Sequence, residues 1–299
     1  MSPRIVGALA TLALILAAAS PAAARPIDEH FEHSFTVEDG VTLHLDQTDG
    51  DVTIETWDRD EIAVEVVFQM EVKRFGFGED PEFNVEFDQR GDHVYVTEFR
   101  KGGFSIGIQS SDRHAYRYTL MVPSYADIDI EADDGDIELA GVRGDIELVL
   151  DDGDVRLDDC FAPLVVLEGQ DGDVVVQGGA GDYDLGLDDG NVRFREVAVG
   201  RLDIQVEDGD IDLELNAAGE VDWQIQTDDG NVRIDVFGPL DAEVSLRSDE
   251  ENIRFDAPGA DVEREEDDAV DLILGDGQGR VQIETDDGDI RFRTEATSG

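Results

Sequence analysis

An acidic turn centred on glycine recurs along this chain and constrains its fold more than any other feature. The intervals between successive turn glycines are 18, 19, 18, 19 and 21 residues, for Gly135, Gly153, Gly172, Gly190, Gly209 and Gly230. The unit recurs at Gly50 and Gly288, and a degenerate copy has Glu251 in the glycine position. This near-constant spacing indicates an internal repeat of nine units.

Apolar and polar residues alternate on both sides of each turn. In the unit at Gly209 the apolar positions are Leu202, Ile204 and Val206 before the glycine, and Ile211 and Leu213 after it. This alternation predicts a strand with one buried face on each side. The five-residue step from Val206 to Ile211 would reverse the buried face in an unbroken strand. The chain is therefore predicted to bend at Asp-Gly, where glycine supplies a positive φ and aspartate accepts hydrogen bonds from local amides.

Two all-β folds fit this unit. In a parallel β-solenoid each unit is one coil, equivalent positions stack about 4.8 Å apart, and the two strands of a coil face each other across a thin core. In a tandem antiparallel β-hairpin array, Asp-Gly forms a two-residue turn and the two strands pair with each other. The near-constant length of the unit favours a solenoid of about 18–21-residue repeats.

Two segments interrupt the repeat. Residues 56–122 contain longer strands at 62–72 and 116–122 and a Gly-rich loop at 75–78. We expect them to form a wider N-terminal β-sheet that caps one end of the array. A second insertion at about 257–269 contains an acidic run, predicted to be a solvated loop, and precedes a half unit at Val270, Leu272 and Leu274.

The first 24 residues have the order of a secretory signal peptide. Arg4 precedes an apolar run over 5–19, and Ala22, Ala23 and Ala24 form the small-residue cleavage site. The apolar run is about 15 residues long, and a membrane-spanning helix needs about 20. We therefore expect no transmembrane segment in the mature chain, and a periplasmic, cell-envelope-associated or extracellular location.

These features divide the chain into three parts. Residues 1–24 are the predicted signal peptide, 25–123 an N-terminal β region with the first repeat, and 124–299 the β-repeat domain. Cys160 is the single cysteine, so no intramolecular disulfide can form.

The charge of the chain excludes one class of partner. The net charge is −52, from 74 acidic and 22 basic residues. Such a surface repels phosphate backbones, which excludes nucleic-acid binding. A high net charge can also indicate a disordered chain. Here apolar residues make up 40% of the sequence and follow a strict period, which argues against disorder.

Three segments resemble a known family. They are 50–54, 57–62 and 118–123. Together with the Gly-Asp-Ile type of turn, they resemble the bacterial putative adhesin domain family, and the resemblance covers about residues 35–295. The resemblance implies a β-helix-like repeat in an exported or envelope-associated protein of unknown ligand, and no catalytic residue can be carried over. The chain departs from the family in placing acids where Ser, Thr or Asn commonly stand. We therefore expect that the fold does not need these carboxylates.

The turn aspartates are the candidate metal ligands. Stacked about 4.8 Å apart, neighbouring carboxylates would repel by about 0.9 kcal/mol in water. Ca²⁺ could offset this repulsion; the alternative is solvated, locally hydrogen-bonded turns in a salty habitat. The spacing matches neither an EF-hand nor the nine-residue calcium β-roll. The candidates are Asp133, Asp134, Asp136, Asp151, Asp152, Asp154, Asp188, Asp189, Asp208, Asp210, Asp228, Asp229, Asp286, Asp287 and Asp289.

A second row of outward residues lies three positions after each turn. It contains Glu138, Arg156, Val175, Arg193, Asp212, Arg233, Arg254 and Arg291. Two interpretations are open: ion pairs with neighbouring acids, which contribute little when exposed, or a groove for anionic glycans.

The histidines do not complete a catalytic site. His30 and His33, beside Glu29 and Glu32, suggest either a metal site or a mobile exported tail, and we favour the tail. His44, His93 and His114 stand apart in sequence, and no nucleophile, base and orienting acid can be assembled.

The sequence therefore predicts an exported, non-enzymatic structural or interaction protein that needs no cofactor and binds an unknown surface, glycan or protein. A Ca²⁺-stabilised acidic module is the alternative. A β-helix polysaccharide-active enzyme is a third possibility, because such enzymes combine calcium-binding acids with a basic catalytic residue.

Overall fold

The computed structural model describes residues 25–78, 82–101, 105–249 and 252–295, and all regular structure in this part of the chain is β-strand. The predicted signal peptide lies outside the described residues, as do the side chain of His114 and Glu251. No helix in the described segments is long and apolar enough to cross a bilayer.

The strands that precede each turn stack side by side into one sheet, here called face A. Its order is β5 (Glu82–Arg90), β6 (His93–Lys101), β2 (Thr42–Asp49), β8 (Asp127–Asp134), β10 (Ile146–Asp152), β12 (Leu164–Asp171), β14 (Ala180–Asp189), the second halves of β15 (Val192–Asp208) and β16 (Ile211–Asp229), β22 (Gly279–Asp287), β18 (Ala242–Ser248), β21 (Ala269–Leu274) and β20 (Asp261–Glu265).

The strands that follow each turn form the opposite sheet, face B. Its order is β1 (Arg25–Thr36), β4 (Glu61–Gly78), β7 (Ser105–Pro123), β3 (Asp51–Trp57), β9 (Ile137–Ala140), β11 (Val155–Asp158), β13 (Val174–Gln177), the first halves of β15 and β16, β17 (Val232–Phe237), β23 (Ile290–Thr294) and β19 (Ile253–Asp256).

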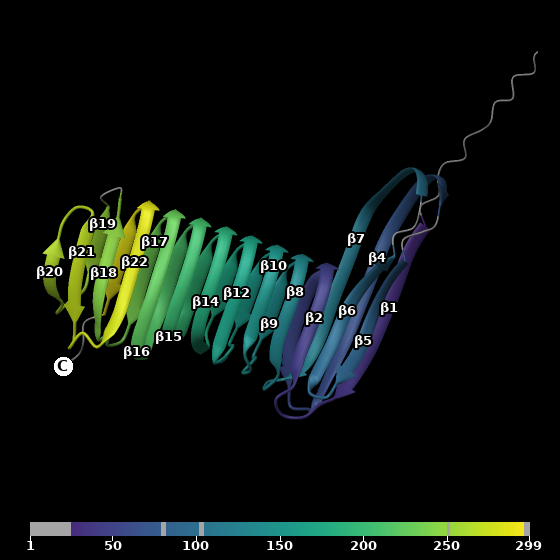
Figure 1. The fold of residues 1–299 in the computed structure, drawn as a ribbon, viewed down its shortest axis with the longest axis horizontal. Helices are drawn as coiled ribbons and strands as arrows, with labels where there is room; N and C mark the ends of the chain where they lie inside the picture. Colours follow the sequence, from purple (N-terminus) through teal and green to yellow (C-terminus); the bar gives the residue numbers. More distant parts are fainter. Residues whose placement is uncertain (1–24, 79–81, 102–104, 250–251, 296–299) are drawn as a thin grey trace, which may run out of the picture.

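Equivalent positions of successive coils pair in parallel register. Leu148, for example, lies between Ile130 and Leu167 on face A. The pre-turn strands thus pair with the pre-turn strands of neighbouring coils, so the chain is a parallel β-solenoid and the tandem-hairpin alternative is wrong. Figure 1 shows the coils as a row of parallel strands with a wider N-terminal end.

The core is the thin layer between the two faces. Inward residues such as Leu148, Phe194 and Ile204 are fully buried. Burial of one such side chain contributes about 1.5–3 kcal/mol, and the repeat places several in every coil.

The last unit in the sequence is not the last coil in space. β22 pairs with β16 on one side and with β18 on the other, and β23 lies between β17 and β19 in the same way. The C-terminal segment is thus inserted between two coils that precede it in the chain, as the yellow β22 in Figure 1 shows.

The N-terminal region widens both faces, as expected for a cap. β1, β4 and β7 extend face B as antiparallel strands, and the β5–β6 hairpin extends face A through the parallel β2–β6 pair. Residues 75–78 are not the predicted Gly-rich loop. They continue β4, because each pairs with a residue of β7.

The acidic insertion also differs from its prediction. Part of it, Asp261–Glu265, is strand β20 rather than a loop, and it pairs antiparallel with β21. All five β20 residues are exposed to solvent, as expected for the acidic run, although they form a strand. The predicted half unit is β21, which runs antiparallel to β18 and not parallel as a half coil would.

Close backbone approach is why glycine occupies the turn. A Cβ atom on Gly172 would lie 2.1 Å from the carbonyl oxygen of Gly153, and one on Gly230 would lie 2.0 Å from that of Gly209. The prediction of a positive φ is confirmed at Gly172, where φ is +144°. At Gly230, φ lies outside the left-handed range. Stacking of the turns therefore excludes a side chain even where the backbone conformation would allow one.

The substitution Gly172→Ala should lower the free energy of unfolding by about 3 kcal/mol, because the methyl group overlaps the preceding coil and φ is unfavourable for alanine. The control is Gly186→Ala in the neighbouring coil, where a Cβ atom meets nothing within 4 Å. It should change stability by less than about 1 kcal/mol. Urea unfolding followed by circular dichroism measures both, and equal losses would contradict the stacking argument.

Candidate functional site

Face A presents an acidic outer surface. Positions are counted from the turn glycine, so that Asp133, Glu131 and Asp129 are −2, −4 and −6 in the coil of Gly135. From this coil to that of Gly230 these rows contain no basic residue. They consist of Asp129, Glu131, Asp133, Glu147, Val149, Asp151, Val166, Glu168, Gln170, Asp184, Gly186, Asp188, Asp203, Gln205, Glu207, Gln224, Gln226 and Asp228.

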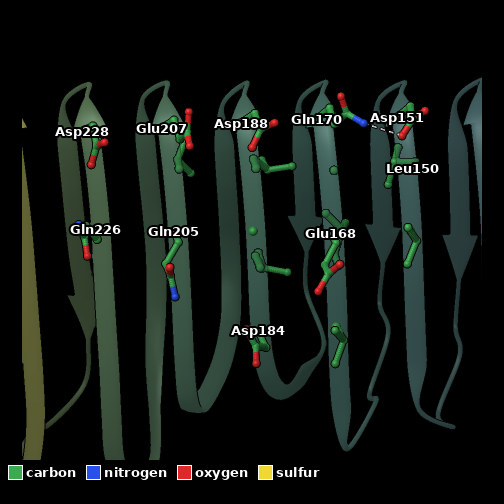
Figure 2. Close-up of a pocket in the computed structure, with 18 residues that line it drawn as sticks. Leu150, Asp151, Glu168, Gln170, Asp184, Asp188, Gln205, Glu207, Gln226 and Asp228 are labelled. Atoms are coloured by element: carbon green, nitrogen blue, oxygen red, sulfur yellow. Dashed lines mark hydrogen bonds between the residues drawn. The ribbon is translucent and has the colours of Figure 1, made fainter.

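An open groove of about 700 Å³ crosses these rows. Gly186 leaves the space open, because a Cβ atom there would meet nothing within 4 Å. Val149, two strands away across Glu168, also lines the groove and is 41% exposed. Figure 2 shows carboxylate and amide groups projecting from consecutive coils, with Gln170 Nε2 donating to Asp151 Oδ1 over 2.7 Å. The groove offers hydrogen-bond acceptors and negative charge around a small apolar floor.

The aspartates at −1 form the predicted ladder. Asp152 is in register with Asp134, and Asp208 with both Asp189 and Asp229, which in turn meets Asp287. The −2 candidates Asp133, Asp151, Asp188, Asp228 and Asp286 run beside them and are exposed. Within the described residues, no three of these carboxylates bring ligand oxygens within 4.8 Å of one another.

The aspartates at +1 have a structural function that the sequence did not suggest. Asp136 Oδ1 accepts the amide of Asp154 at 3.0 Å, and Asp154 Oδ1 accepts that of Asp173 at 2.9 Å. The pattern continues through Asn191, Asp210 and Asn231 to the amide of Asp289. The fold therefore needs a side-chain oxygen acceptor in this row, and Asn191 and Asn231 supply it as the aspartates do, so no carboxylate is required.

The arginine row at +3 stacks as predicted, and two of its arginines form close ion pairs. Arg156 binds Asp158 at 2.8 Å in its own strand, and Arg233 binds Asp235 at 2.6 Å. The hydrogen bonds that Arg233 donates to Asp235 raise the pKa of Arg233, so this guanidinium remains charged. This ion pairing contrasts with the −2, −4 and −6 rows of face A, which contain no basic residue from the coil of Gly135 to that of Gly230.

A histidine pair at the cap was missed by sequence reasoning. His44 Nδ1 lies 2.6 Å from Asp129 Oδ2, and His44 Nε2 lies 2.9 Å from His93 Nδ1. Tyr95 stacks on His44 with ring centroids 4.7 Å apart. The residues meet because β2 lies between β6 and β8. The alternation around His44 indicates that it points outward, but only the strand order identifies its neighbours.

The second histidine cluster lies in an ordered strand, so the predicted mobile tail is wrong. β1 pairs with β4 over its whole length. His30 Nε2 lies 2.9 Å from Glu65 Oε1 and 3.4 Å from Glu32 Oε1. One nitrogen and two carboxylate oxygens could take a divalent cation, but all three residues are exposed. His33 instead stacks on Phe87.

The hydrogen-bond ladder at +1 predicts a specific effect of Asp173→Ala. It should lower the free energy of unfolding by about 1 kcal/mol, because the amide of Asn191 loses its acceptor. Asp173→Asn should retain the stability, since asparagine already has this function at Asn191 and Asn231. The exposed Asp188→Ala is the control, and a loss there equal to that of Asp173→Ala in thermal unfolding would contradict the assignment.

Comparison with known proteins identifies a family. No curated protein matches the chain. Among solved structures, the crystal structure of a putative cell adhesion protein from Clostridium sporogenes ATCC 15579 is 12% identical, with a TM-score of 0.30, over 91% of this chain and 100% of that chain. The Toastrack DUF4097 family model matches residues 41–293, which contain every coil from Gly50 to Gly288. The chain belongs to the Toastrack DUF4097 family.

Proposed function

We propose that this chain is an exported, non-enzymatic structural and interaction protein that presents face A to a partner. The observation that carries the proposal is the set of outward carboxylates and amides on face A, with no basic residue in their rows from the coil of Gly135 to that of Gly230. A surface, glycan or protein that supplies positive charge or hydrogen-bond donors would pair with these carboxylates and amides. The groove at Gly186 is the place on face A where a partner can approach the backbone.

The solenoid suits such a role because it holds its outer residues rigidly. Each strand of a central coil pairs on both sides, and the inward residues are almost completely buried. Side chains at one position therefore repeat about every 4.8 Å along the stack. A partner with a regular surface would meet the same chemical groups repeatedly, and this favours binding over a reaction at one point.

Export agrees with the state of the only cysteine. Cys160 is buried, and burial raises the pKa of its thiol. A protonated, inaccessible thiol reacts slowly with oxidants and with other disulfides. The residue pattern of 1–24 supports export on separate grounds.

The histidine pair does not favour catalysis. Both ring nitrogens of His44 are engaged, one by Asp129 and the other by His93. A general base needs a nitrogen within reach of a substrate proton. The pair thus joins the cap to the first coils of face A.

The purified protein should not cleave acidic polysaccharides. Incubation with polygalacturonate and hyaluronate, followed by reducing-end and 232 nm absorbance assays, should give the same signal as buffer. Arg193→Ala and Arg233→Ala are the matched variants, because a lyase would need a basic residue on this row. Turnover by the wild type that either substitution abolishes would overturn the proposal.

A second candidate function is a calcium-stabilised module, favoured by the uninterrupted carboxylate ladder at −1. Neighbouring carboxylates about 4.8 Å apart repel. A divalent cation between two coils would offset that repulsion, and hard cations prefer carboxylate oxygens.

For this candidate, Ca²⁺ at about 1 mM, the range of extracellular calcium modules, should raise the melting temperature. NaCl of equal ionic strength and an equal concentration of Mg²⁺ are the controls. Asp152→Asn with Asp208→Asn, which interrupt the ladder, should reduce the calcium response. If NaCl or Mg²⁺ reproduces the whole shift, charge screening is sufficient and the ladder is not a calcium site.

A further inference from the structure

We propose that three stacked arginines at the C-terminal end of face B bind an anionic polysaccharide. These residues, Arg233, Arg291 and Arg254, are called the arginine triplet. The inference goes beyond the interaction proposed for face A, since it concerns the opposite sheet and the opposite charge.

The insertion of the last coil creates the triplet. Arg291 on β23 is in register with Arg233 on β17 and with Arg254 on β19. All three occupy the outward +3 row, so their side chains project from neighbouring strands about 4.8 Å apart. In sequence they are separated by 21 and 37 residues.

The triplet is only partly neutralised by the protein. Asp235, with its side chain 12% exposed, binds Arg233 at 2.6 Å and Arg293 at 3.5 Å. Arg254 is 75% exposed and has Asp289 at 3.6 Å. Arg291 is exposed and has no acidic partner within the residues that the structure describes.

The surroundings of the triplet also differ from those of other arginines. Arg195, two coils away from Arg233, is bound by Asp212 at 2.6 Å and has Glu214 at 3.7 Å. At the triplet, the +1 row has Asn231 and Asn252 on the outer strands and Asp289 on the middle strand. In a chain with 74 acidic and 22 basic residues, three adjacent like charges repel one another unless a bound anion offsets them.

The chemistry of the triplet selects the ligand class. Guanidinium groups bind carboxylate and sulfate groups through paired hydrogen bonds. On one face of an extended peptide, side chains repeat every 6.6–6.8 Å or so, and this spacing does not match adjacent strands. An extended polysaccharide with an anionic group on each sugar carries carboxylates along its whole length, so several of them can meet the stacked guanidinium groups. Polygalacturonate is therefore the probe.

The net charge predicts an unusual dependence on salt. The Debye length is about 30 Å at 0.01 M, so at low salt the polyanion is repelled by the whole acidic protein. At 0.15 M it is about 8 Å, and the ligand interacts mainly with the triplet. At 1 M it is about 3 Å, and this attraction is screened too. Affinity should be highest at intermediate ionic strength.

The test is fluorescence anisotropy of labelled polygalacturonate oligomers with the full-length protein, from 0.01 to 1 M NaCl. We expect a maximum near physiological salt and roughly tenfold weaker binding for Arg291→Ala and for Arg254→Ala. Arg193→Ala is the matched control, because it removes an exposed arginine from the same row outside the triplet. It should change affinity by less than twofold.

Unchanged affinity in Arg291→Ala and Arg254→Ala, or affinity that only falls as salt rises, would overturn the proposal. Equal or tighter binding of polyglutamate would assign the triplet to acidic polypeptides instead. Melting curves of each variant verify folding. Arg291→Lys retains the charge but not the paired hydrogen bonds of the guanidinium group, so it distinguishes the loss of these bonds from the loss of charge. Face A is unchanged in all these variants, so failure here leaves the proposed function to its own test.

Discussion

The stacking of turn backbones is the constraint on which the rest of the structure depends. From Gly135 to Gly288, each turn glycine lies against the carbonyl of the turn glycine in the neighbouring coil, at a distance that leaves no room for a Cβ atom. Once the turns are stacked in this way, the strands on both sides are fixed in parallel register. The buried rows, the ladders and the two outer faces all follow from that register.

This constraint explains why a large part of the fold could be predicted from the sequence. The odd step between Val206 and Ile211 already required a bend at Gly209, and the near-constant spacing favoured stacked equivalents over a hairpin array. Thr227 matched the apolar pattern less well, and the structure gives the reason: it is fully buried and its hydroxyl donates to the carbonyl of Gly209. Thr285 donates to the carbonyl of Gly230 in the same way.

The order of the coils could not be predicted, because spacing identifies units and not their neighbours. The unit at Gly288 resembles every other unit, yet it stacks on that of Gly230 instead of following β18 and β19. The histidine pair has the same cause, since His44 and His93 meet only through the pairing of β2 with β6. Long-range pairing therefore determines the clusters of the candidate site, while local pattern determines which residues point outward.

The acidic residues divide into groups with different physical roles. At +1 they hold the amide of the next coil, so aspartate and asparagine are interchangeable there. At −1, −2 and on the outer rows of face A no such requirement is visible, and the charge is directed to solvent. On face B, arginine is the most frequent residue at +3, and the inserted last coil gathers three of these arginines at one end. A chain that is acidic on average thus carries two surfaces of different charge, and binding to each should respond differently to salt.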